Sequence, residues 1–347
     1  MNKTAYLLLE NGEIMKGRYF GAEGAIVGKV VFCTTMIGYL ETITDPAYEG
    51  QIILQTFPLI GNYGVISEDF EHANISPRAY VVKYECKDPS NFRSEGNIDE
   101  LFKQQNVIGV SGIDTRKLTK IIRDNGVMNA KIMDSEPTAA DITEVKSYKI
   151  DRPVAKVSAA RGEVAGNGEP TVALIDLGAT KPVTNYLTER DCTVHHFAYD
   201  ADFEEIMKIN PQGIMLSGGP GDPTDPANLK TIETIKRLQA ANLPIFGICL
   251  GYQLLAAANG YKTEKMKFGH CGANQPVKDL KTDKIYITSQ NHGYKVIADD
   301  PWFVNVNDKT CEGLMHSEDV FGVQFRPTAG TPNTEFLYDV FVERMKK

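Results

Sequence analysis

The sequence predicts an α/β protein of two domains, the second built on a doubly wound, mostly parallel sheet. At 347 residues the chain exceeds one ordinary hydrophobic core. Short β-rich runs separated by turn residues occupy the first half, whereas buried strands alternate with helical segments from Thr171 onward. Between these two halves, at about 150–170, the sequence is less apolar and its glycines do not recur at a regular spacing. We therefore expect domains at 1–149 and 171–347, joined by a linker at 150–170.

The first domain is expected to combine short strands with one amphipathic helix. The helix is predicted at 114–123, where Leu118, Ile121 and Ile122 share a face and Asp114 can cap the start. The predicted strands are 6–9, 14–20, 30–34 and 51–55.

The second domain shows the alternation of strands and helices that produces a parallel sheet. Apolar runs at 172–176, 193–197, 213–217 and 244–248 are separated by helical segments, one ending at Thr188 and one spanning 228–240. Ligands of such sheets bind at the carboxyl ends of the strands. We therefore expect the site near Asp176, 217–221 and Cys249.

Composition and charge exclude several classes of function. A net charge of -8 argues against a nucleic-acid or anionic-membrane surface. No apolar run reaches the roughly 18 residues of a membrane span, and the first ten residues lack a signal-peptide pattern, so the cytoplasm is expected. The six cysteines lack paired spacing, so neither a disulfide framework nor a thiolate zinc site is expected.

Cys249 is predicted to be a nucleophile at a tight turn. It follows a short apolar strand and precedes a helical stretch at 252–259, with Gly247 and Gly251 on either side. The glycines permit a strained elbow, and the helix N-terminus favours a thiolate and offers backbone N–H groups to an oxyanion. The alternative is an ordinary buried cysteine, which is how we interpret Cys33, Cys86, Cys192, Cys271 and Cys311.

Several motifs resemble those of one enzyme family. GICLGYQLLA at 247–256 and LSGGPGDP at 216–223 resemble the nucleophile motif and the substrate loop of class I glutamine amidotransferases. The segments MKFGHCGANQPV from Met266 and SQNHGY from Ser289, with dense similarity at 30–65 and 111–128, resemble the small subunit of carbamoyl phosphate synthetase.

The resemblance implies a small-subunit N-terminal domain followed by an amidotransferase domain. It implies glutamine hydrolysis that supplies ammonia to a large subunit for carbamoyl phosphate synthesis, in pyrimidine and arginine biosynthesis. ATP and Mg²⁺ are then expected in the large subunit, with no cofactor and no metal in this chain. The family's glutamine contacts fall on Thr35, Gly219, Gly221, Leu250, Gln253, Asn291, Gly293 and Tyr294. An ordinary Pro-Gly turn is an alternative for the two glycines of the loop.

Two substitutions depart from the family pattern. Where the family carries a catalytic histidine and a glutamate that orients it, the segment VQFRPTAG places Arg326 and Thr328. Arginine stays protonated and has no acceptor, so it cannot shuttle protons. We expect impaired glutaminase activity, although a cation at Arg326 would lower the pKa of Cys249 and leave a reactive thiolate. Tyr252 also replaces a histidine of the family, and GATKPV at 178–183 departs from its pattern.

Three functions are compatible with these substitutions. The first is a subunit that retains glutamine binding while its complex uses free ammonia. The second keeps hydrolysis through another proton shuttle, such as His292 or a residue of the partner. The third is a catalytically inactive structural or regulatory partner. His270 and His316 are interpreted as structural, and His72, His195 and His196 as remote from the site.

Overall fold

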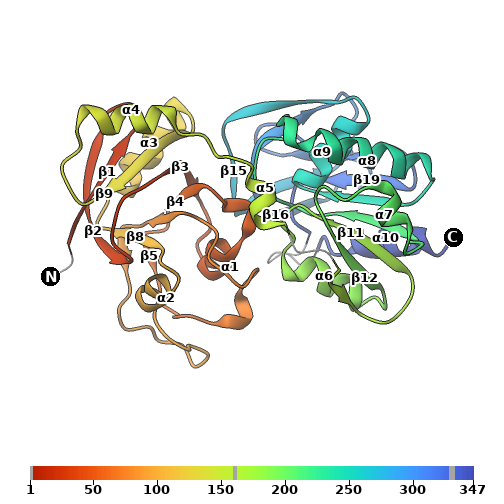
Figure 1. Ribbon diagram of the computed structural model, residues 1–347, viewed down its shortest axis with the longest axis horizontal. Coiled ribbons are helices and arrows are strands. Elements are labelled where there is room, and N and C mark those ends of the chain that lie inside the picture. Colours follow the sequence, from red (N-terminus) through yellow and green to blue (C-terminus); the bar gives the residue numbers. More distant parts are fainter. Residues whose placement is uncertain (1–2, 159–161, 328–332) are drawn as a thin grey trace. The chain divides into compact units, whose positions relative to one another are not determined.

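The computed structural model describes residues 3–158, 162–327 and 333–347. The chain forms two compact units, Met1–Asp151 and Arg152–Lys347. The first is drawn from red to yellow and the second from green to blue in Figure 1. The region expected as a linker, 150–170, contains helix α5 (Pro153–Val157) and strand β10 (Val164–Ala165).

The first unit is a closed β-barrel with the strand order β1–β2–β8–β6–β4–β3–β9. Ala5, Leu7 and Leu9 alternate along β1 into the same apolar core, as expected for a strand with one buried face. The barrel strands are β1 Thr4–Leu9, β2 Ile14–Gly21, β3 Ile26–Cys33, β4 Gln51–Gln55, β6 Ala79–Val81, β8 Ile108–Ser111 and β9 Met128–Met133. A separate parallel pair joins β5 Leu59–Ile60 to β7 Tyr84–Glu85.

The predicted helix at 114–123 is confirmed as α3 (Thr115–Asn125). Asp114 is its N-cap and accepts a hydrogen bond from the Lys117 backbone N–H at 2.9 Å. Leu118 and Ile122 are fully buried in the barrel core. The other helical segments of this unit are α1 Tyr39–Thr44, α2 Ile98–Gln104 and α4 Ala139–Ser147, with the 3₁₀ turns η1 Pro46–Tyr48 and η2 Ser67–Asp69.

The second unit contains one ten-stranded sheet, ordered β10–β12–β11–β13–β14–β19–β18–β16–β15–β17. The run β12–β11–β13–β14–β19 is parallel, as the alternating pattern predicts, and the pairs outside this run are antiparallel. The further strands are β11 Thr171–Asp176, β12 Thr193–Ala198, β13 Gly213–Leu216, β14 Ile245–Ile248, β15 Lys262–Asp279, β16 Ile285–Ile297, β17 Phe303–Asn305, β18 Cys311–Met315 and β19 Val320–Val323.

Helices cover both faces of the parallel part. On one face Phe246 and Phe321 stack at 4.6 Å and pack with residues of α6 and α10. On the other face Ile245 packs with residues of α7, α8 and α9. The unit is therefore doubly wound. Its further helices are α6 Lys181–Thr188, α7 Phe203–Met207, α8 Leu229–Ala240, α9 Leu250–Ala258 and α10 Phe336–Met345, with the 3₁₀ turn η3 Pro226–Asn228. In the described part of the chain, no helix has the length and apolarity needed to cross a membrane.

Candidate active site

Cys249 occupies a strained turn between strand β14 and helix α9. Its φ of 51° is unusual for a residue with a side chain, and strain of this kind costs about 1–3 kcal/mol. The backbone N–H of Cys249 donates to the Val323 carbonyl at 2.9 Å, which holds the turn against β19. The geometry is that of a nucleophile elbow at a helix N-terminus.

The flanking glycines are required by close backbone approach. A Cβ at Gly251 would lie 2.5 Å from the Leu216 carbonyl oxygen, and a Cβ at Gly247 would lie 2.9 Å from the Tyr252 nitrogen. Both distances are shorter than van der Waals contact. Both positions flanking Cys249 therefore require glycine for a steric reason.

Gly251→Ala is expected to lower the melting temperature by about 5 °C or more, because the added methyl group must displace backbone. Differential scanning fluorimetry of the full chain would measure the shift. Gly96→Ala is the control, since a Cβ there meets nothing closer than Glu100 Oε2 at 3.9 Å. The control should shift by about 1 °C at most. Equal shifts for the two variants would contradict the steric argument.

Cys249 is buried, with 2% of its surface exposed, and amide groups lie around its sulfur. Its Sγ lies 3.6 Å from the Asn291 carbonyl oxygen and 3.6 Å from Gln324 Nε2, which donates to it. Gln253 Nε2 in turn donates to Gln324 Oε1 and to the Tyr294 carbonyl, each at 2.9 Å. Residues of α9, β16 and the end of β19 thus meet at the nucleophile.

The loop after β13 is also beside the nucleophile. A Cβ at Gly218 would lie 3.6 Å from Cys249 Cβ, and the Gly251 N–H donates to the Ser217 carbonyl at 3.1 Å. Gly219 has no room for a side chain, because a Cβ would lie 2.1 Å from the Leu177 carbonyl oxygen. Gly221 has φ 113°, which favours glycine.

The structure brings several predicted glutamine contacts together. The Asn291 carbonyl contacts the thiol, Gln253 is linked to it through Gln324, and Leu250 begins α9 directly after Cys249. The Tyr294 hydroxyl donates to Asp222 Oδ2 at 2.7 Å, which links β16 to the loop after β13. A Cβ at Gly293 would meet no atom within 4 Å.

Thr35 belongs to the first unit, where it follows β3. Its hydroxyl accepts a hydrogen bond from Cys33 Sγ at 3.3 Å, and its carbonyl accepts one from Gln55 Nε2. Its contact with glutamine stays a prediction.

Gln324 and Asp222 are polar site residues that the sequence analysis missed. The signals were present: Gln324 is a polar residue within the otherwise apolar run 320–325, and Asp222 lies inside the glycine-rich loop motif. Neither residue type is distinctive without the fold that places it beside Cys249 or Tyr294.

Arg326 lies two residues beyond Gln324. Its backbone N–H donates to the Ser289 carbonyl at 2.9 Å, so this segment pairs with β16. Arg326 is half-buried, and the flanking Phe325 and Pro327 are buried. Thr328 lies outside the described residues.

His292 is engaged away from the sulfur. Its Nδ1 lies 2.8 Å from the Tyr294 carbonyl and its Nε2 lies 2.9 Å from Gln290 Oε1. Burial, with the nearby His270 charge, lowers the pKa of His292 to about 3, so its ring is neutral near pH 7. To act as the alternative proton shuttle, the ring would have to leave both partners.

His270 shows the opposite shift. Burial disfavours its charged form, but hydrogen bonds with Asp308 and Glu312 outweigh that effect and raise its pKa to about 9. Burial lowers the pKa of His316 to about 4.

A thiol at a strained strand–helix turn, beside a glycine loop and a cluster of amides, is the arrangement expected of an enzyme with a cysteine nucleophile. In agreement, residues 173–343 match the family model for class I glutamine amidotransferases. Residues 7–132 match the model for the CPSase domain of the carbamoyl-phosphate synthase small chain.

Relatives match over almost the whole chain. The carbamoyl phosphate synthase small chain of Archaeoglobus fulgidus is 42% identical over 359 residues, covering 99% of each chain. That of Clostridium perfringens is 42% identical and covers 98% of this chain and 99% of its own. The small chain of Staphylococcus epidermidis is 41% identical, and the match covers 100% of this chain and 97% of that protein. The chain therefore belongs to the family of carbamoyl phosphate synthase small chains, the glutamine-hydrolysing subunits of a ligase of pyrimidine and arginine biosynthesis.

Proposed function

We propose that this chain binds L-glutamine and a carbamoyl phosphate synthetase large subunit but hydrolyses glutamine poorly, so that the complex draws on free ammonia. The observation that carries the proposal is Arg326, which stands at the family's histidine position in the segment that pairs with β16. Gln324, in the same segment, touches the Cys249 sulfur.

The chemistry explains why this substitution matters. Hydrolysis requires thiolate attack on the amide, protonation of the departing ammonia, and base-assisted attack of water on the thioester. The helix N-terminus at Cys249 supports the first step. The two later steps need a group that both donates and accepts protons near pH 7, and a guanidinium cannot accept one.

Glutamine binding is supported by the parts of the pocket that remain. The hydrogen bonds that join Gln253, Gln324 and Tyr294 fix amide and backbone groups around the sulfur. Such groups can hold the amide and the charged end of glutamine. ATP and Mg²⁺ are assigned to the large subunit.

The proposal is tested by carbamoyl phosphate synthesis with the cognate large subunit. We expect synthesis with ammonium and a rate at least about 100-fold lower with glutamine, from loss of the acid–base contribution. The control is a small chain with the complete His–Glu pair, assembled with its own large subunit. Equal rates with the two nitrogen donors would overturn the proposal. Stable assembly without glutamine binding would instead indicate a purely structural or regulatory partner.

A further inference from the structure

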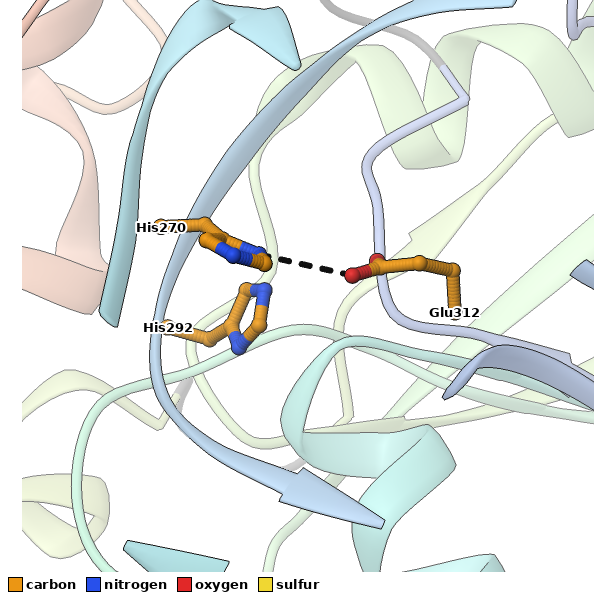
Figure 2. Close-up of side chains that lie close together, drawn as sticks. All are labelled: His270, His292 and Glu312. Atoms are coloured by element: carbon orange, nitrogen blue, oxygen red, sulfur yellow. Dashed lines mark ion pairs between the residues drawn. The ribbon is translucent and has the colours of Figure 1, made fainter. Parts of the chain in front are cut away.

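Three titratable side chains that the proposed function does not use meet inside the antiparallel part of the sheet. His270 from β15, His292 from β16 and Glu312 from β18 point toward one another (Figure 2), and each can offer a ligand atom within 4.8 Å of the others. Their exposed fractions are 7%, 9% and 0%. Buried charges at this density need partners, so the hydrogen bonds around them must be accounted for.

Both ring nitrogens of His292 face oxygen atoms, but a neutral imidazole carries only one N–H. The Tyr294 carbonyl can only accept, so the 2.8 Å contact with Nδ1 places the ring proton there. The other nitrogen, Nε2, is then a lone pair, and it faces Gln290 Oε1 at 2.9 Å. Two buried acceptors thus face each other.

Gln290 links the two histidines, because its Oε1 lies 2.9 Å from His270 Nδ1 and 2.9 Å from His292 Nε2. In the orientation described, Gln290 Nε2 donates to the Thr288 hydroxyl at 3.1 Å, and that hydroxyl donates to the Gln275 carbonyl at 2.9 Å. After rotation, the single hydroxyl proton of Thr288 would face two acceptor oxygens. In the orientation described, which keeps both of these hydrogen bonds, His292 Nε2 is a buried acceptor without a donor.

Glu312 adds a further buried acceptor. Its Oε1 accepts from the Thr310 hydroxyl at 3.0 Å and lies 3.4 Å from His270 Nδ1. Its Oε2 is buried and has no hydrogen-bond partner among the described residues. The cluster therefore contains two buried acceptor atoms without donors, His292 Nε2 and Glu312 Oε2, which a cation can satisfy.

We propose that His270, His292 and Glu312 bind a divalent cation of the zinc class, with Gln290 Oε1 as the fourth ligand. Two imidazoles and a carboxylate are a donor set that zinc uses in proteins. Four ligands about 2.1 Å from a tetrahedral zinc ion lie roughly 3.4 Å apart. The His270 Nδ1–Glu312 Oε1 separation is 3.4 Å, and Gln290 Oε1 lies 2.9 Å from each of His270 Nδ1 and His292 Nε2.

The outer contacts of the two histidines fit the same assignment. His270 Nε2 lies 3.0 Å from Asp308 Oδ2, and His292 Nδ1 lies 2.8 Å from the Tyr294 carbonyl. Each ring can therefore give its N–H to an outer oxygen and turn its other nitrogen toward the cluster, as metal-bound histidines do.

The role of this site is structural. Its ligands are buried and come from three strands, and four protein ligands leave no open position for substrate. The proposed metal site lies next to the residues around Cys249. The backbone N–H of Gln324 donates to the Glu312 carbonyl at 2.8 Å, and Asn291, whose carbonyl contacts Cys249, directly precedes His292. Bound zinc would fix β15, β16 and β18 beneath the amide cluster.

The first test uses the full chain without an affinity tag. Protein stripped with a chelator is dialysed against Zn²⁺ and compared with untreated protein. We expect one zinc per chain by elemental analysis and a rise in melting temperature on zinc addition. Co²⁺ distinguishes this site from the cysteines, because nitrogen and oxygen ligands give no thiolate-to-cobalt charge-transfer band. Failure to bind zinc, or a thiolate band, would overturn the proposal.

The second test compares variants that keep side-chain size. Glu312→Gln should weaken zinc binding about 100-fold or more, and Asp308→Asn, which acts through His270, about 10- to 100-fold. His316→Gln is the matched control, since it removes a half-buried histidine outside the cluster. It should leave zinc affinity unchanged. Equal affinity in the control and in Glu312→Gln would overturn the assignment, and if Glu312→Gln does not fold, the first test still decides.

Discussion

Arg326→His combined with Thr328→Glu is expected to raise the glutaminase rate of the assembled complex by about 100-fold or more. The double change restores a base that can accept and return a proton and a carboxylate that orients it. The thiol, its elbow and the contacts of Gln324 and Gln253 with their neighbours are already in place. Release of glutamate from glutamine, with and without the large subunit, measures the result.

The single changes separate the two roles. Arg326→His alone should recover part of the rate, because an unoriented histidine still exchanges protons. Thr328→Glu alone should recover none, because it has no base to orient. Arg326→Lys is the control that keeps the positive charge, and it should stay as slow as the parent. If the double variant remains slow while glutamine still binds, the pocket differs from that of active relatives in more than these two positions.

The sequence predicted the nucleophile turn because its determinants are local. Gly247, Cys249 and Gly251 lie within five residues of sequence. A side chain at either glycine would clash with Leu216 or Tyr252, because strand β14 packs against β13 and α9. The helix at Thr115–Asn125 was predicted for the same reason, since its cap and its apolar face are encoded in one short segment.

Closure of the first unit into a barrel could not be predicted in the same way. It depends on β1 pairing with both β2 and β9, whose residues are more than a hundred positions apart. Two of the barrel strands, β6 and β8, are only three and four residues long. Runs this short carry too little periodicity to identify a pairing partner.

The buried histidine cluster was missed for a related reason. His270, His292 and Glu312 are about twenty residues apart in sequence, without the close ligand spacing that marks common zinc motifs. They meet because β15 pairs with β16, placing His270 opposite His292, and because β18 pairs with β16 in turn. The sequence expectation of no metal in this chain rested on the lack of a spaced ligand motif and on the family resemblance.

The six cysteines differ in the settings that control their reactivity. Cys33, Cys192, Cys249, Cys271 and Cys311 are buried, and Cys86 is half-buried. Burial raises the pKa of Cys192 to about 11 and also raises that of Cys311. Only a small fraction of either thiol is ionised near neutral pH.

Cys249 is expected to react with iodoacetamide fastest of the six, at least about 10-fold faster than Cys192, since the helix N-terminus at Cys249 favours the thiolate. Peptide mass mapping after brief labelling near neutral pH measures the order, and Cys86 supplies the rate of an accessible thiol. Saturating glutamine should slow labelling of Cys249 and leave Cys86 unchanged. If Cys249 reacts no faster than Cys33 or Cys192, it is an ordinary buried cysteine and the nucleophile assignment is wrong. If it reacts fast without protection by glutamine, the elbow persists while the pocket around Gln253 and Asn291 has lost its ligand, which would favour the structural partner over the glutamine-binding subunit.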